Sequence, residues 1–149
     1  SNIVSSWDVL NGQEVNGDCV VIGGGLVGAE TAEYLANKGH QVTIVEMMDK
    51  IAAGESTTVL PLMMKDFADH HVKQLVNTKV DHIENNIVYT ENDQIKADTI
   101  INALGSKKNI FDDSSITIPH VCVGDCSGER TADIASAIRT AYKAANEID

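Results

Sequence analysis

The 149-residue sequence predicts an α/β fold with a parallel sheet, flanking helices and a small antiparallel β-meander. Short apolar runs without polar alternation are typical of strands that are buried on both faces of a parallel sheet. A segment with apolar residues at helical spacing separates two of these runs. In a middle region the pattern changes to an alternation of apolar and polar residues. The chain is 43% hydrophobic and 22% charged, which is enough apolar material for a real core.

The first half of the chain is expected to alternate strand and helix. A β-branched apolar run over 18–22 predicts the first buried strand, and glycines follow it at once. Small and apolar residues recur at helical spacing over 26–38, and Gly39 stands where a helix C-cap favours a left-handed residue. Residues 41–45 predict a second strand, which completes a right-handed βαβ unit. An apolar stripe predicts a second helix over 57–69.

The second half begins with the alternating region, which predicts three antiparallel strands over 79–83, 87–90 and 94–97. The turns between these strands are expected at Asn85-Asn86 and at Glu91-Asn92-Asp93. A continuous apolar run over 99–104 then predicts a return to the buried sheet. Beyond a polar loop, we expect a further buried strand over 119–123 and a long helix over 131–148.

Composition narrows the classes of partner and the compartment. Eleven Lys and Arg against 22 Asp and Glu give a net charge of −11, which disfavours nucleic acid and anionic membrane surfaces as partners. No apolar run approaches the roughly 18 residues that would span a bilayer. The three cysteines form no disulfide framework and the five histidines show no ligand spacing. We therefore expect no membrane, no metal site and a cytoplasmic location.

A glycine motif directly follows the first predicted strand. Residues 23–28 fit the pattern G-x-G-x-x-G between a strand and a helix. In that context Gly23 permits a tight turn, Gly25 lets the backbone approach a pyrophosphate, and Gly28 lets helix and strand pack closely. The helix N-terminus favours an anion through its unpaired N–H groups and its dipole. The motif predicts a Rossmann-like domain whose cofactor-binding loop consists of Gly23, Gly24, Gly25, Leu26, Val27 and Gly28.

Glu46 ends the second predicted strand, 18 residues after Gly28. This spacing is close to the ~20 residues expected of the carboxylate that accepts hydrogen bonds from an adenosine ribose. A carboxylate there would repel a 2′-phosphate, and no arginine follows at 47–49. We therefore expect NAD(H) rather than NADP(H) as the dinucleotide. The neighbouring pair Met47 and Met48 is interpreted as core filler.

Further motifs occur in a fixed order along nearly the whole chain. They are Ser6-Trp7-Asp8-Val9-Leu10, the run from Val20 to Ala32, Asn77-Thr78-Lys79-Val80, Ala103-Leu104-Gly105 and Val123-Gly124-Asp125-Cys126. Through these stretches the sequence resembles the C-terminal part of the NADH:flavin oxidoreductases related to old yellow enzyme. That group includes 2,4-dienoyl-CoA reductase, 2-enoate reductase and trimethylamine dehydrogenase.

In that family, the resemblance implies, an N-terminal barrel carries FMN and an iron-sulfur cluster. A domain that takes the nicotinamide cofactor interrupts the FAD domain of the same enzyme. On this basis the chain divides into an N-terminal linker over 1–16, an NAD(H)-binding domain over 17–108, and the closing strand and helix of an FAD-binding domain over 109–149. The first half of that FAD domain and the barrel are absent from these residues, and they are the expected partners.

The resemblance also implies cofactor contacts outside the glycine loop. Gly124 and Asp125 match the motif that touches the ribityl and diphosphate region of FAD, so the chain would hold part of an FAD site. The stretch Ala103-Leu104-Gly105 matches the loop that borders the dinucleotide, and Glu30 matches a position often near the nicotinamide. No residue is expected to act as a catalytic acid, and the cysteines do not have the spacing of a redox pair.

These features predict the NADH-binding portion of a larger flavin enzyme. It would deliver hydride from NADH to FAD for the reduction of an enoate or dienoyl-type substrate, while the protein supplies binding and orientation. Two alternatives remain open. The glycine loop binds FAD in a half-domain of a pyridine nucleotide-disulfide reductase-like enzyme, or the chain is a non-catalytic module that senses NADH.

Overall fold

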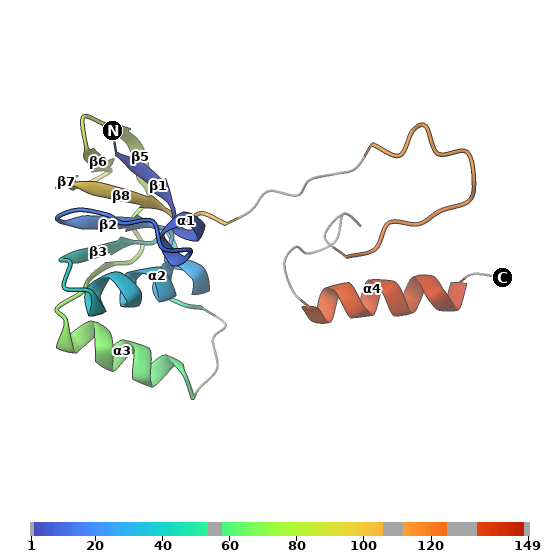
Figure 1. The fold of residues 1–149 in the computed structure, drawn as a ribbon, viewed down its shortest axis with the longest axis horizontal. Helices are drawn as coiled ribbons and strands as arrows, with labels where there is room; N and C mark the ends of the chain where they lie inside the picture. The colour runs from blue at the N-terminus through green and yellow to red at the C-terminus, as the bar shows by residue number, and fades with distance from the viewer. Residues whose placement is uncertain (1, 54–57, 106–111, 125–133, 148–149) are drawn as a thin grey trace. The chain divides into compact units, whose positions relative to one another are not determined.

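The computed structural model describes residues 2–53, 58–105, 112–124 and 134–147 (Figure 1). The chain separates into two compact units, Ser1–Gly105 and Ser106–Asp149. The first unit contains strands β1 to β8 and helices α1 to α3, and the second contains helix α4. Each unit is described by itself.

The first unit is built on a five-stranded sheet, which confirms the predicted α/β class. The strands lie in the order β1-β8-β2-β3-β4, and each neighbouring pair is parallel. All four residues of β2 are buried, because helices cover one face of the sheet and the meander covers the other. The strands of this sheet are β1 (Ile3–Ser5), β2 (Cys19–Ile22), β3 (Val42–Val45), β4 (Lys73–Leu75) and β8 (Thr99–Asn102).

Strand β2, helix α2 (Leu26–Asn37) and strand β3 form the predicted βαβ unit. The helix begins at Leu26, within the glycine motif, and buries its small residues against the sheet. It ends at Asn37, one residue before the predicted end, and Gly39 adopts φ +91° after the last turn as expected of a C-terminal glycine. Ile22 is in register with Val45, so the carboxyl ends of β2 and β3 lie side by side.

Residues 3–10 form a strand and a helix where a linker was expected over 1–16. Strand β1 pairs with β8, and helix α1 (Ser6–Leu10) follows without a break. The Ser5 hydroxyl caps this helix by accepting the Trp7 N–H at 3.1 Å, and Val9 is fully buried in the core that includes α2. Elements of three and five residues are too short to show a periodicity in the sequence.

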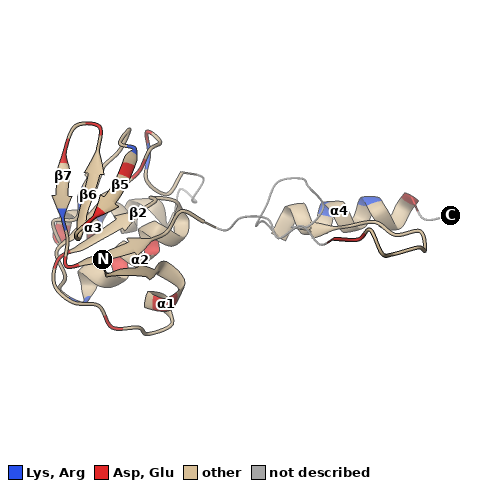
Figure 2. Cartoon of the chain, turned by 90° about the horizontal axis from the view of Figure 1, so that it is seen from above, with Lys and Arg blue, Asp and Glu red and all other residues tan. Residues whose placement is uncertain are grey.

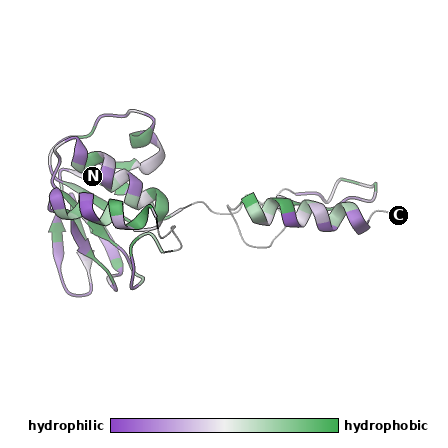
Figure 3. Cartoon of the chain, turned by 90° about the horizontal axis from the view of Figure 1, so that it is seen from below, coloured by the Kyte–Doolittle hydropathy of each residue, from purple (hydrophilic) through white to green (hydrophobic). Residues whose placement is uncertain are grey.

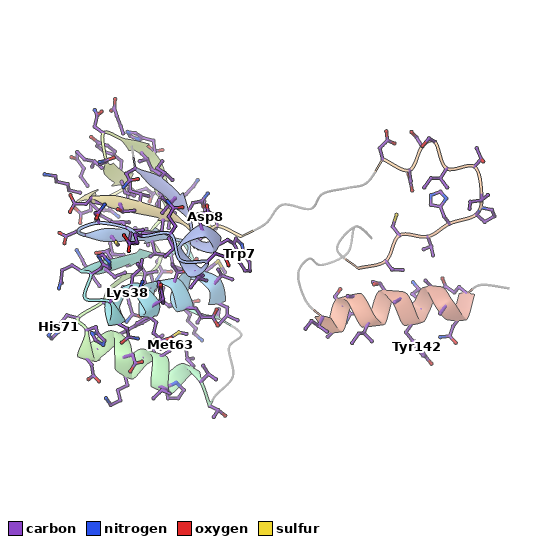
Figure 4. All side chains as sticks on the ribbon, viewed as in Figure 1. Trp7, Asp8, Lys38, Met63, His71 and Tyr142 are labelled. Carbon is purple, nitrogen blue, oxygen red and sulfur yellow. The ribbon has the colours of Figure 1, made fainter. Side chains whose placement is uncertain are left out.

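Helix α3 (Leu60–Asp69) confirms the second predicted helix, whose residue 57 lies outside the described part. Its first turn contains Pro61, a residue that fits this position because the first helical N–H groups have no partner. Met63 lies on the side of α3 that faces α2 (Figure 4), and both Met63 and Phe67 are buried. Strand β4 follows and was not predicted, since Lys73 and Gln74 are polar and exposed.

Strands β5 (Val80–Glu84), β6 (Ile87–Thr90) and β7 (Gln94–Lys96) form the predicted antiparallel meander. Asn85 and Asn86 make the first turn, and both adopt the positive φ that tight hairpins require. In a second core cluster, Val88 of the meander is buried with Ile100 and Val45 of the parallel sheet. The meander therefore covers the face opposite α2 and α3 (Figure 1).

In the second unit, the structure describes an irregular segment over 112–124 and helix α4 (Ile134–Glu147). Helix α4 confirms the predicted C-terminal helix, of which residues 131–133 and 148 lie outside the described part. The buried strand predicted over 119–123 is wrong, because most of this segment is exposed and it has no strand structure. A strand requires a hydrogen-bonded neighbour, and the described part of the second unit has none to offer.

Acidic side chains occur on strands, helices and loops and do not gather at one place (Figure 2). Their spread follows from the excess of 22 Asp and Glu over 11 Lys and Arg, which mostly occupies solvated surface. Among the residues that the structure describes, no helix combines the length and the apolar character that crossing a membrane requires.

Candidate functional site

A cleft of about 780 Å³ lies at the carboxyl edge of the parallel sheet. The ends of β2, β3 and β8 line one side, and the residues that lead into and form β5 line the other. Most of the lining is apolar, and its charged groups are Glu46, Lys79 and Asp81. Open α/β sheets bind ligands in the crevice beyond the carboxyl ends of their strands, so this cleft is the candidate site.

The glycine loop joins β2 to α2 at this cleft. Gly23 adopts φ +100°, and a Cβ there would lie 2.6 Å from the carbonyl oxygen of Ala103. A Cβ on Gly28 would lie 1.9 Å from the carbonyl oxygen of Gly23. Gly25 is different, since no atom lies within 4 Å of its Cβ position. The tight turn and the close helix packing are therefore observed, and Gly25 leaves open space at the cleft.

Helix α2 begins at this open space. Gly25 is its N-cap, and the first helical hydrogen bond runs from the Ala29 N–H to the Gly25 carbonyl at 2.9 Å. The N–H groups that precede Ala29 have no helical partner, and the first turn contains no acidic residue. Unpaired donors and the positive end of the helix dipole favour an anion. The loop and the helix terminus therefore fit a diphosphate.

Glu46 stands at the end of β3 and lines the same cleft. Its side chain is 9% exposed, and its two oxygens accept hydrogen bonds from the backbone. Oε2 accepts the Gly24 N–H at 2.6 Å, and Oε1 accepts the Met48 N–H at 2.7 Å. The carboxylate predicted from spacing alone therefore contacts the glycine loop directly.

The predicted residues divide into groups. Those that line the cleft are Gly23, Gly25, Glu46, Ala103, Leu104 and Gly105. Those that belong to the loop or to α2 without lining the cleft are Gly24, Leu26, Val27, Gly28 and Glu30. Gly124 lies in the second unit, where its N–H donates to the Thr140 hydroxyl at 2.8 Å. Asp125 lies outside the described residues.

Part of the cleft was missed by sequence reasoning. Met47 and Met48 are 65% and 56% exposed and line the cleft, so their interpretation as core filler is wrong. Both follow the last strand residue of β3 and stand at the sheet edge instead of inside it. The opposite wall, residues 78–83, was not assigned to a site because β4 was not predicted. The stretch Asn77-Thr78-Lys79-Val80 was the available signal.

The thiols of the chain give no sign of redox chemistry in the described residues. Cys19 is buried in β2, and burial together with Asp18 and Asp98 raises its pKa to about 11. A thiol with such a pKa remains protonated and unreactive at neutral pH. Cys122 is half-buried, and Cys126 lies outside the described residues. The part of the chain that the structure describes also holds no cluster of three side chains suited to a metal ion.

The fold and the cleft define a Rossmann-type dinucleotide-binding domain. The parallel βαβ core, the glycine loop and the strand-terminal carboxylate are its characteristic parts. Residues 2–121 match the family described as Pyridine nucleotide-disulphide oxidoreductase, and the chain belongs to this family. Its members are flavoprotein oxidoreductases that use NAD(H) and FAD, the two cofactors predicted for this chain.

The chain is also similar to individual proteins over nearly its whole length. Bilirubin reductase from Mediterraneibacter gnavus is 45% identical over 153 residues, which cover 97% of this chain and 24% of that protein. Cinnamate reductase from Clostridium sporogenes is 30% identical, and the match covers 98% of this chain and 23% of that protein. A solved structure of 2-naphthoyl-CoA reductase shares the fold, with a TM-score of 0.74 and 24% sequence identity. The match covers 98% of this chain and 23% of that one. The chain spans about a quarter of the length of these proteins.

Proposed function

We propose that this chain is the NADH-binding portion of a flavin-dependent oxidoreductase. Its task is to hold NADH so that the nicotinamide passes its hydride to FAD, which oxidises NADH to NAD⁺. The cleft carries this proposal, because open space at Gly25, the N-terminus of α2 and the Glu46 carboxylate meet at one edge of the sheet. This combination of groups is typical of a dinucleotide site, and the spacing of Glu46 favours NAD(H) among the dinucleotides.

Each group has a distinct part in binding. The N–H groups at the start of α2 would hold the diphosphate, and Gly25 admits it because no side chain fills the approach. The Glu46 carboxylate would accept hydrogen bonds from ribose hydroxyls and repel a 2′-phosphate. This repulsion favours NADH over NADPH. The local field of the helix terminus offsets the net charge of −11 at the point where the anion binds.

The proposal extends to the enzyme that contains this domain. Cinnamate is an enoate, and the similarity to cinnamate reductase and bilirubin reductase supports a parent enzyme that reduces an enoate or dienoyl-type substrate. Relatives about four times as long leave room for a barrel of the old yellow enzyme type with FMN and an iron-sulfur cluster. Residues 109–149, with Gly124 and Asp125, would close the FAD-binding domain of that enzyme.

Fluorescence titration of the purified chain with NADH and NADPH tests the proposal. We expect saturable binding of NADH and at least about tenfold weaker binding of NADPH, because the Glu46 charge opposes the extra phosphate. Gly25→Ala should weaken NADH binding, while circular dichroism shows an unchanged fold. Absence of saturable NADH binding, a preference for NADPH, or a purified protein with flavin absorbance in place of NADH binding would each contradict the proposal.

A further inference from the structure

One buried carboxylate connects the glycine loop to the segment that follows β3. Both oxygens of Glu46 are engaged by backbone N–H groups, Oε2 by Gly24 at 2.6 Å and Oε1 by Met48 at 2.7 Å. Hydrogen bonds to an ionised acceptor are roughly twice as strong as neutral ones. The bond to Gly24 is buried, so water does not compete for it. The side chain therefore ties together two segments that form the cleft.

The same two segments are joined at further points. The Ala52 N–H donates to the Gly24 carbonyl at 2.7 Å, so residues 46–52 bind both polar groups of the Gly24 backbone. Ile51 also packs against it, since a Cβ on Gly24 would lie 2.5 Å from the Ile51 Cδ1 atom. Ala52 is 1% exposed and holds φ +50°, a left-handed conformation that alanine keeps only where its surroundings impose it. Loop and segment therefore form one packed body.

We propose that Glu46 is a positioning residue that assembles the dinucleotide site before any cofactor binds. This inference rests on the proposed function and adds a second task to the ribose contact. The Gly24 N–H is committed to Glu46, so the diphosphate is bound by N–H groups from Gly25 onward. Each carboxylate oxygen can accept a second hydrogen bond, which leaves capacity for the ribose hydroxyls. The cofactor then meets a loop and a carboxylate whose positions are already set.

The chemistry of the carboxylate shows why glutamate suits both tasks. An ionised carboxylate only accepts hydrogen bonds, so it can serve two N–H groups at once. Glutamine has the same shape but places an NH₂ donor against one of them, and a buried donor without an acceptor destabilises the folded state. Aspartate keeps the charge, but its side chain is one methylene shorter and cannot reach both partners with the same geometry.

Glu46→Gln tests both tasks in the full chain. We expect the midpoint of thermal unfolding without cofactor, measured by circular dichroism, to fall by roughly 5 to 10 °C. In fluorescence titrations the Kd for NADH should rise about tenfold or more. The ratio of the NADPH Kd to the NADH Kd should fall, because the repelling charge is gone. Glu84→Gln makes the same change on an exposed carboxylate of β5 and should alter none of these values.

The readouts separate this proposal from its rivals. An unchanged midpoint without cofactor would overturn it, because a residue that contacts only ribose does not affect the cofactor-free protein. A lower midpoint with an unchanged NADPH to NADH ratio would also overturn it, since Glu46 would then be structural only. If Glu46→Gln does not fold, Glu46→Asp replaces it: the midpoint without cofactor should still fall and the Kd for NADH should still rise, while the NADPH to NADH ratio stays near the wild-type value because the charge is kept. Failure of the proposed function is recognised separately, by a wild-type chain that binds neither dinucleotide.

Discussion

Helices α2 and α4 differ in what they bury, and this difference separates the two units of the chain. Helix α2 places small and apolar residues against the parallel sheet, and Ala29 and Ala32 are fully buried. Helix α4 instead buries two hydroxyl residues, Ser136 and Thr140, and one small apolar residue, Ala144. The large apolar side chains of α4 are exposed: Ile134 is 81% exposed, Ile138 64% and Tyr142 72%.

The exposed residues of α4 recur every fourth position and therefore share one face. Apolar and polar bands alternate along the helix (Figure 3), and Tyr142 projects from the side away from the 112–124 segment (Figure 4). A regular apolar stripe on a helix is normally covered by protein. The first unit therefore contains its own core, whereas the described part of the second presents uncovered apolar surface. This difference supports the proposal that residues 109–149 close an FAD-binding domain.

Alanine substitutions in the two units should give the largest contrast. Phe67 is 1% exposed, so Phe67→Ala should lower the free energy of unfolding by about 3 to 5 kcal/mol. Ile138 is 64% exposed, so Ile138→Ala should change it by less than about 0.5 kcal/mol. Urea unfolding followed by circular dichroism measures both values. Similar losses at the two positions would show that α4 is packed in the free chain, and would break the comparison.

Alanine at two glycines tests how closely individual atoms are packed in the first unit. Gly28→Ala would bring Cβ to 1.9 Å from a backbone oxygen that cannot easily move, so we expect a loss of about 3 kcal/mol in unfolding free energy. Gly25→Ala is the matched control, because it meets no atom within 4 Å. Its loss should stay near 1 kcal/mol, the cost of alanine at an N-cap. Equal losses would contradict the close packing assigned to Gly28.

Much of the first unit could be predicted from sequence because its elements have clear periodicity. Strand β6 occupies its predicted range, and α2 ends one residue earlier than predicted. The short strands β1 and β4 were missed, since three residues do not establish a period. The strand predicted over 119–123 was wrong for a different reason. Its apolar composition is typical of a buried strand, but pairing depends on a neighbour that local sequence does not reveal.

The candidate site was predictable where its parts are close in sequence. The glycine loop is a continuous motif, and Glu46 follows from the usual length of a βαβ unit. The far wall over 78–83 could not be assigned, because it depends on which strands become neighbours in the sheet. The exposure of Met47 and Met48 follows from the same cause, since methionines after a buried strand fit either a core or a sheet edge. Contacts between distant segments therefore account for most of what was missed.

The end of α3 offers a smaller test of how well the first unit is packed. His71 (Figure 4) holds φ +56°, and the following Val72 N–H donates to the Phe67 carbonyl at 2.8 Å. This is a helix C-terminal turn that glycine adopts without steric cost. His71→Gly should therefore raise the unfolding free energy by about 0.5 kcal/mol, after the greater entropy of unfolded glycine is subtracted. His70→Gly, at an ordinary φ of −98°, is the matched control and should lower it.

Two neighbouring carboxyl groups, Glu33 on α2 and Asp66 on α3, should give the smallest change in unfolding free energy. Burial, and then a hydrogen bond with Asp66, raise the pKa of Glu33 above its ordinary value of 4.5. The folded chain therefore binds this proton more tightly than the unfolded chain. The stability that it contributes is fully present below pH 4.5 and is lost as the pH rises through the raised pKa.

Glu33→Gln removes this titration and should stabilise the folded chain only where Glu33 is ionised. At about pH 7 we expect a gain of up to roughly 0.5 kcal/mol, because solvent screens a carboxylate that is only half-buried. At about pH 4 the variant and the wild type should unfold together, since both side chains are then neutral. Thermal unfolding at the two pH values measures the difference, with Glu14→Gln as an exposed control. An equal gain in stability at both pH values would contradict this prediction. The gain would then come from the shape of the glutamine side chain and not from removal of the charge, and α2 would pack less closely on α3 than on the sheet.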